Sequence, residues 1–339
     1  MISERAGTVL NILVNEYIQT AVPVASEEIA RLSPTKVSAA TIRNAMSQLT
    51  DEGYISRPHI SAGGVPSDRG YRHYLQCLET PSELPDQLRR QILEQFYQVD
   101  SDVVAWSQRC AAILSRITAN MAIVTVPRAN APRLQQVQLT YLQESLALLI
   151  IVLQEARLLR RLLHLEETTS QGLLNQTANK LNEYFAGLSW SEIEAQQLEL
   201  APLEERVKLD TVAMLRETET DAVLEHYVGG LRLLLNQPEF AQAQRAREVV
   251  EMVEERVLLE SVLAEAPQSS DVAVYIGEEN QEEALRPFGV ILCRYGIPHR
   301  ASGTICVIGP TRMGYAQAIS GVSYLSSVMG QLVLELHGG

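Results

Sequence analysis

The sequence predicts an α+β protein whose first seventy-five or so residues form a winged helix-turn-helix. Helical periodicity, a strand-like stretch and a glycine turn follow one another in that segment. Strand-like segments lie on both sides of a helical, glutamate-rich block near 190–250, which indicates an insertion. A linker rich in Pro and Ser, Thr80–Pro85, separates these two parts. A length of 339 residues suits two or three domains.

The N-terminal segment has the element order of a winged helix-turn-helix. Residues 4–20 carry an apolar stripe at helical spacing, and Pro23 breaks the chain after them. A short helix is expected over 26–31, and a third helix over 38–52 with Gly53 as its stop. A short strand at 54–58, a glycine turn at 61–67 and a helix from Asp68 are expected to follow.

Beyond the linker, strand-like and helical segments alternate less regularly. Amphipathic helix is expected over 87–119, in two pieces. Strands are expected at 121–126, 137–142, 146–153, 272–277, 289–296 and 304–309, and further helices at 173–188 and 315–336. Strands, a helical block and more strands predict an α+β domain with an insertion.

Composition excludes several classes of protein. Hydrophobic residues make up 46% and charged residues 20%, as in ordinary globular proteins. The longest apolar run, Leu146–Leu153, is far shorter than the roughly 20 residues of a membrane span, and the N-terminus does not resemble a signal peptide. The four cysteines form no CxxC pair, so neither zinc nor a disulfide framework is expected. We therefore expect a cytoplasmic protein without metal, cofactor or membrane contact.

The charge distribution matters more than the net charge of −13. From Arg31 to Leu75 there are six basic and three acidic residues, a local charge of +3. The remainder of the chain then carries −16. A basic patch on an acidic protein can bind phosphate, while the acidic surfaces repel DNA.

The third helix is the candidate DNA-reading element. Arg43 can donate bidentate hydrogen bonds to guanine or bind a phosphate, and Asn44 can pair with adenine. A glycine turn near Arg57 would bring backbone close to the sugar-phosphate chain. The candidate DNA-contacting residues are Ala40, Thr41, Arg43, Asn44, Ser47, Arg57, His59 and Ser61. Two other interpretations remain open: the polar face is only solvated, or the winged helix binds protein.

Features that could suggest an enzyme have simpler explanations. Gly309–Arg312 lacks the phosphate-loop pattern, so a turn after a buried strand and an ion pair of Arg312 are expected there. Glu278 and Glu279 are expected on a strand, where neighbours point to opposite faces and cannot share a substrate. The six histidines are scattered and form no metal-binding or triad spacing. No enzymatic activity is therefore expected.

The stretch Val37–Leu75 closely resembles the N-terminal domain of the HrcA family of heat-inducible transcription repressors. Three segments far downstream also resemble that family, in chain order. They are Gly230–Phe240, Tyr275–Asn280 and Ile308–Tyr315. Because these matches are independent and span nearly the whole chain, they are stronger evidence than a single winged helix.

The resemblance implies three parts: a DNA-binding domain, a GAF-like α+β domain and a dimerising segment inserted into it. The expected boundaries are 1–78 for the DNA-binding domain, 79–87 for the linker, 88–189 and 251–339 for the GAF-like domain, and 190–250 for the insert. The resemblance also implies a homodimer that binds double-stranded DNA at an inverted repeat (CIRCE) and represses chaperone operons. The GroE chaperonin is the implied modulator. The alternative is a metabolite-responsive repressor of the IclR type with a GAF effector pocket.

Two residues depart from the family pattern. Gly64 stands where the family usually has an arginine at the wing tip, and Ala45 stands where an acidic residue usually follows Arg-Asn. If the wing arginine contacts phosphate, its absence shifts recognition onto Arg43, Asn44 and Arg57.

Overall fold

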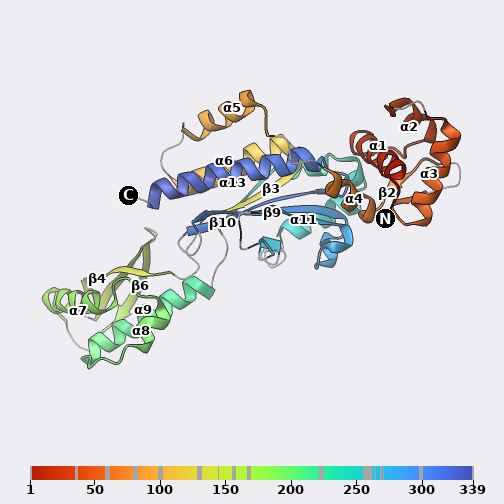
Figure 1. Ribbon diagram of the computed structural model, residues 1–339. Coiled ribbons are helices and arrows are strands. Elements are labelled where there is room, and N and C mark those ends of the chain that lie inside the picture. The colour runs from red at the N-terminus through yellow and green to blue at the C-terminus, as the bar shows by residue number, and fades with distance from the viewer. Residues whose placement is uncertain are drawn as a thin grey trace. The chain divides into compact units, whose positions relative to one another are not determined.

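The computed structural model of the chain divides into two compact units (Figure 1). The first unit comprises Met1–Val126, His226–Tyr295 and Thr304–Leu332, and the second comprises Pro127–Glu225, Gly296–Gly303 and Val333–Gly339. The structure describes residues 2–34, 37–57, 62–78, 83–97, 102–127, 132–143, 145–154, 158–165, 169–220, 225–254, 262–263, 265–267, 269, 271–297 and 301–337.

The N-terminal part of the first unit, residues 2–78, is named the head. Its elements follow the order that the sequence predicts, and their bounds agree closely. They are α1 (Glu4–Thr20), α2 (Ser26–Leu32), α3 (Ala39–Asp51), β1 (Ile55–Ser56), β2 (Val65–Pro66) and α4 (Asp68–Cys77). β1 and β2 pair antiparallel as a hairpin. Ser38 and Ser67 explain where α3 and α4 begin, because each side chain accepts a backbone N–H of the first turn.

The head has its own apolar core between α1 and α3. Leu10 and Leu13 of α1 are fully buried, as are Ile42 and Leu49 of α3 and Ile55 of the hairpin. These α3 residues recur at helical spacing on one side of the helix, so its polar residues occupy the other sides.

The remainder of the first unit, residues 83–126, 226–295 and 304–332, is named the body. It contains a five-stranded sheet in the order β7-β3-β10-β9-β8. The strands are β3 (Met121–Thr125), β7 (His226–Gly229), β8 (Ala273–Ile276), β9 (Phe288–Ile297) and β10 (Ala301–Pro310). β3 is antiparallel to both β10 and β7, and all of its residues are buried. The sequence predicts each of these strands except β7.

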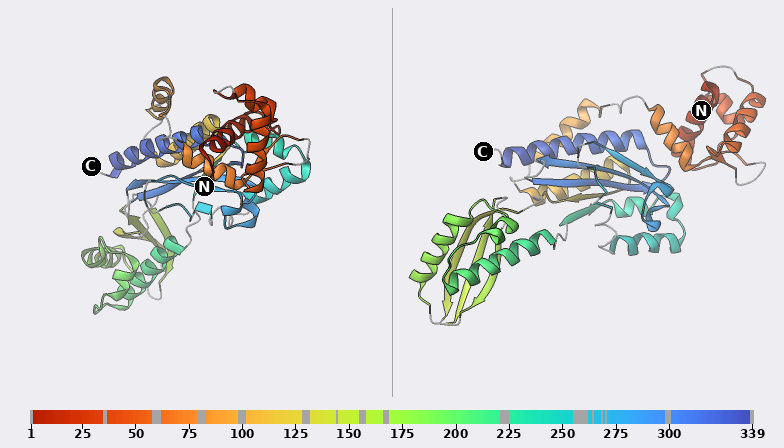
Figure 2. Two further views of the ribbon diagram at one scale, coloured as in Figure 1. Left: turned by 45° about the vertical axis from the view of Figure 1, so that its right-hand side comes forward. Right: turned by 60° about the horizontal axis from the view of Figure 1, so that its bottom comes forward.

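The described part of the body also contains five α-helices. They are α5 (Asp86–Tyr97), α6 (Val103–Thr118), α10 (Leu231–Leu235), α11 (Ala243–Glu254) and α13 (Tyr315–His337). Figures 1 and 2 show α6 and α13 running together along the sheet. They are in close contact, because a Cβ on Gly321 of α13 would lie 3.2 Å from a methyl carbon of Leu114.

Among the described residues, α13 is the one helix that is long and apolar enough to span a membrane by length and composition. Its Val322, Leu325 and Met329 side chains are fully buried within the protein. This burial is what is expected of a core helix that packs on a sheet.

The second unit has a separate sheet with helices on one face. β4 (Leu134–Gln143), β5 (Leu146–Leu153) and β6 (Leu158–His164) form an antiparallel three-stranded sheet in the order β4-β5-β6. α7 (Gln171–Phe185), α8 (Trp190–Ala195) and α9 (Pro202–Thr220) complete the unit. Alternate β5 residues, such as Leu149 and Ile151, share a core with Leu181 of α7 and Leu215 of α9.

The structure places the inserted unit elsewhere than the sequence analysis does. The expected insert was 190–250, whereas 127–225 form most of the second unit and 226–250 belong to the first. Two strands cause the difference. β4 pairs with β5 and not with the sheet of the body, and β7 at residues 226–229 pairs with β3. A shift in composition near residue 190 does not reveal strand partners, because pairing is set by contacts distant in sequence.

Candidate nucleic-acid interface

α3 presents a polar surface because its apolar side is used by the core of the head. Ala40, Arg43, Asn44 and Ser47 are exposed, and Thr41 is half-buried at the first turn. The N-terminal turn is held by Ser38, whose hydroxyl accepts the Thr41 backbone N–H at 3.2 Å. The five helical candidates from the sequence analysis therefore lie on one element, and four of them are exposed.

Two candidate hydroxyls have internal partners. Thr41 Oγ1 lies 2.9 Å from Ser38 Oγ, and Ser47 Oγ donates to the Arg43 carbonyl at 3.1 Å. A hydroxyl has one proton and two lone pairs, so each retains capacity for a phosphate or a base edge.

The Arg43 guanidinium is paired with an acidic neighbour in the preceding helix. Its Nη2 donates to Glu27 Oε1 of α2 at 2.8 Å, and both side chains are mostly exposed. Hydrogen bonds from its own backbone and from Ser26, together with the Arg43 charge, hold the pKa of Glu27 below its ordinary value. Glu27 is therefore ionised at neutral pH and competes with any anion that approaches Arg43.

The hairpin is fixed against the chain before α2. Gly64 and Val24 exchange two backbone hydrogen bonds of 2.9 Å. Gly63 allows this approach, because a Cβ there would lie 2.4–2.5 Å from backbone atoms of Pro23 and Val24. Arg57 follows β1 and is half-buried, and its Nε is enclosed without a hydrogen-bond partner among the described residues.

The other two wing candidates, His59 and Ser61, lie outside the described residues. The described part of the candidate interface consists of α3 and Arg57.

The structure revises the expected consequence of Gly64. Gly64 is buried, and a Cβ there would point at Leu13, Met46 and Ile55, with the Leu13 methyl carbon at 2.8 Å. Position 64 thus faces the apolar core of the head rather than solvent. Gly64 is better explained by close packing of the hairpin than by the loss of a phosphate contact.

Two residues of α4 that are not among the sequence candidates, Arg69 and Gly70, contact the turn that follows α3. Arg69 of α4 lies over the Tyr54 ring, 4.4 Å from its centroid, and donates to the Glu52 carbonyl at 2.7 Å. Gly70 lets α4 approach this turn, since a Cβ would lie 2.2 Å from the Tyr54 carbonyl oxygen. The sequence feature that could have indicated this contact is Gly70, a glycine within a stretch of helical periodicity.

The acidic pair singled out in the sequence lies in a turn rather than on a strand. β8 ends at Ile276, and Gly277–Glu279 form a 3-10 turn, η2. The Glu279 carboxylate pairs with Arg72 of α4, and the Glu278 backbone N–H donates to Asp68. The strand placement was wrong because Gly277 takes a left-handed φ of 57°, which ends the extended backbone.

The expected ion pair of Arg312 is confirmed. Its guanidinium binds the Glu239 carboxylate, and both side chains are largely buried. Among the described residues, His, Cys, Asp and Glu side chains form no group of three that could hold a metal ion.

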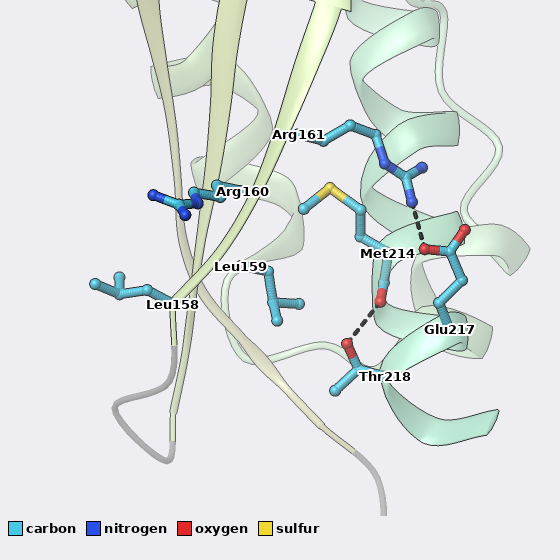
Figure 3. A pocket seen from close by; sticks show the side chains of 7 residues that line it. All are labelled: Leu158, Leu159, Arg160, Arg161, Met214, Glu217 and Thr218. Atoms are coloured by element: carbon cyan, nitrogen blue, oxygen red, sulfur yellow. Dashed lines mark hydrogen bonds and ion pairs between the residues drawn. The ribbon is translucent and has the colours of Figure 1, made fainter. Parts of the chain in front are cut away.

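The second unit contains an open hollow. The hollow lies between β6 and α9 (Figure 3), and its volume is about 340 Å³. It is lined by Leu158, Leu159, Arg160, Arg161, Met214, Glu217 and Thr218. Arg161 is already paired with Asp210 and Glu217, and Thr218 donates to the Met214 carbonyl at 2.8 Å. The Arg161 charge, which lines the hollow, is thus compensated by carboxylates of the protein.

Comparison with known proteins identifies the family of the chain. The family model described as HrcA protein C terminal domain matches residues 105–319. A heat-inducible transcription repressor HrcA from Dehalococcoides mccartyi is 40% identical over 338 residues, covering 100% of this chain and 98% of the relative. The protein of the same description from Herpetosiphon aurantiacus is 37% identical over 345 residues, covering 99% and 97%.

One solved structure shares the fold. A crystal structure of a hypothetical protein at 2.2 Å resolution has a TM-score of 0.60 and 22% identity, with 98% of each chain covered. A full-length match at 40% identity and a family model that covers most of the chain lead to one conclusion. The chain belongs to the HrcA family.

Proposed function

We propose that this chain is a heat-inducible transcription repressor whose head is a winged helix-turn-helix that binds double-stranded DNA. The observation that carries the proposal is the full-length similarity to relatives named for heat-inducible transcription repression. That name favours a response to heat over the metabolite-responsive alternative. Repressors act on DNA in the cytoplasm of bacteria, so we place this chain there.

The geometry of the head supports DNA binding through α3. A major groove accepts one helix, and side chains from the N-terminal half of that helix reach base edges. Arg43 and Asn44 lie on that half, exposed, next to Ala40. The hairpin and Arg57 are the wing of this proposal, together with His59 and Ser61 from the sequence analysis.

We propose that the body is the GAF-like domain and that the second unit is its dimerising insert. One face of the β4-β5-β6 sheet supports this assignment. The alternate β5 residues Leu146, Leu148, Ile150 and Val152 are only half-buried, whereas their neighbours form the core. Leu158 and Leu162 on β6 are 69% and 54% exposed. An uncovered apolar sheet face of this kind is typical of a subunit interface.

A homodimer suits an inverted-repeat operator, because two-fold symmetry presents the same helix to each half-site. We propose that this operator lies before chaperone genes and that the GroE chaperonin modulates the repressor. The acidic net charge outside the head would keep other surfaces away from DNA.

A gel-shift titration tests DNA binding. The full chain should bind a chaperone-promoter fragment that contains an inverted repeat more tightly than a scrambled fragment of equal length. The observed affinity should fall steeply with salt, since phosphate contacts release counterions. Equal binding to both fragments would contradict specific recognition.

Sedimentation of interface variants tests the dimer. Leu162→Lys places a charge on the uncovered sheet face and should shift the protein toward monomer. Leu209→Lys is the matched control, because Leu209 is an exposed leucine (58%) on α9 outside that face. If both variants remain dimers, the dimer forms through another surface.

A further inference from the structure

Three segments of the body come together beside the head, although they are far apart in sequence. They are Leu234–Phe240, η2 with the end of β8, and the turn from Pro310 to Tyr315. The second and third segments contact the C-terminal end of α1 and one side of α4. The first segment holds Arg312 through the side chains of Gln237 and Glu239. We propose that these contacts form a docking socket that fixes the head on the body, with Arg312 and Arg72 as positioning residues for operator binding. This inference rests on the proposed function.

Arg312 is the most buried ionic element of the socket. Its side chain is 11% exposed, and its Nη1 donates to the Ile18 carbonyl at 3.0 Å. The same guanidinium binds the Glu239 carboxylate and the Gln237 side-chain oxygen. Ile18 lies in the last turn of α1, where carbonyls lack partners within the helix and a cation is favoured. One guanidinium thus joins the head to two parts of the body.

Arg72 and Asp68 make a second connection from α4. Arg72 Nε donates to Glu279 Oε1 at 2.8 Å, and Nη2 donates to the Val274 carbonyl at 2.6 Å. In return, the Glu278 backbone N–H donates to Asp68 Oδ2 at 3.0 Å. A Cβ on Gly277 would lie 1.9 Å from that carboxylate oxygen, so glycine is needed for this approach.

An aromatic pair fills the centre of the socket. Tyr71 of α4 and Tyr315 of α13 have ring centroids 5.9 Å apart, and both side chains are essentially buried. Tyr315 Oη donates to the Thr311 carbonyl at 2.7 Å, which also fixes the turn that carries Arg312. Aromatic residues enclosed by polar and ionic contacts are the pattern of a specific interface.

The socket leaves the DNA-facing surface free. Contacts to the body use α1 and α4, whereas Arg43 and Asn44 of α3 stay exposed. Half-sites of an inverted repeat are read together when the two recognition helices are held about one helical turn apart, roughly 34 Å. If each head is fixed on its body, the dimer holds the two α3 helices at a set separation. Binding affinity then depends on the spacing between the half-sites. A head joined only by a linker would bind each half-site separately.

The test uses the full chain, Arg312→Gln, Arg72→Glu, Glu279→Arg and the double swap Arg72→Glu/Glu279→Arg. Arg247→Gln is the control, since Arg247 pairs with Glu251 on the surface of α11. Binding is measured on two duplexes, one with the natural half-site spacing and one with about 5 bp inserted, half a turn of the double helix. Calorimetry of the free protein measures whether head and body unfold together.

We expect Arg312→Gln and both single charge variants to lose at least about tenfold in affinity for the natural spacing. Their affinity for the altered spacing should stay unchanged, and a separate transition of the head should appear in calorimetry. The double swap should recover part of the preference for the natural half-site spacing. Arg247→Gln should have the same affinities and the same unfolding transition as the unmodified chain. Unaltered spacing preference with a single transition in the socket variants would overturn the docking proposal.

Calorimetry, which does not depend on DNA, separates the docking proposal from the proposed DNA-binding function. If the unmodified chain binds neither duplex above a scrambled control, the proposed function fails, while calorimetry still decides whether head and body are coupled. If a single variant loses its helical circular dichroism, the double swap is the deciding measurement. A double variant that recovers the spacing preference supports the Arg72–Glu279 contact. A folded double variant that does not recover this preference contradicts it.

Discussion

The head has two surfaces that are assembled differently: the exposed face of α3 and the contact with the body. The α3 face is built from neighbours in sequence: Arg43, Asn44 and Ser47 lie within two turns of one helix. The opposite contact with the body joins residues more than 200 positions apart, such as Arg72 with Glu279 and Arg312 with Ile18. The first face is polar and exposed, and the second is largely buried. Local periodicity therefore reveals a candidate binding surface, whereas contacts between residues distant in sequence are found only in the tertiary structure.

The largest expected effect is on the buried face. Gly277→Ala should destabilise the first unit by about 2–4 kcal/mol, because it combines a left-handed φ with a clash against Asp68. Chemical denaturation monitored by circular dichroism measures this. Gly314→Ala in the neighbouring turn is the control, since nothing lies within 4 Å of its added Cβ. Equal stabilities for the two variants would show that Asp68 does not approach Gly277 this closely.

A smaller effect is expected on the exposed face. Arg43→Ala should cost about 1–3 kcal/mol of specific operator binding, with a smaller loss on nonspecific DNA. Its stability should change little, because the Arg43 side chain is 60% exposed. Titrations on operator and scrambled duplexes measure the difference. If both affinities fall equally, Arg43 binds phosphate and does not read a base.

The smallest effect concerns the ion pair within the head. Glu27→Gln removes the carboxylate that competes for Arg43 and should tighten DNA binding by roughly two- to fivefold at low salt. Glu28→Gln is a matched control on α2, because Glu28 pairs with Arg31 and not with Arg43. The gain should vanish at high salt. Equal gains for both variants would indicate a general charge effect instead.

The sequence predicted the head almost residue by residue, because caps and periodicity are local. Ser38 and Ser67 begin α3 and α4, and Gly53 follows α3 with a left-handed φ of 76°. The candidates on α3 were found for the same reason, and their contact with DNA remains a prediction. The exposed position of a residue on a helix follows from spacing alone.

The insert boundaries and the socket could not be predicted in this way. Strands β3 and β4 can both be recognised as strands in the sequence, but their pairing partners decide which unit each belongs to. The burial of Gly64 against Leu13 likewise depends on how the hairpin folds back. The downstream segments near Gln237, Gly277 and Arg312 were visible as family resemblances, and their shared role emerged only when the fold brought them together.

Footprinting on genomic DNA, with and without added chaperonin, tests the central claim most directly. The account predicts protection of two equivalent half-sites of an inverted repeat upstream of chaperone genes, and stronger protection when chaperonin is present. Protection without two-fold symmetry, or none at promoters of chaperone genes, would contradict it.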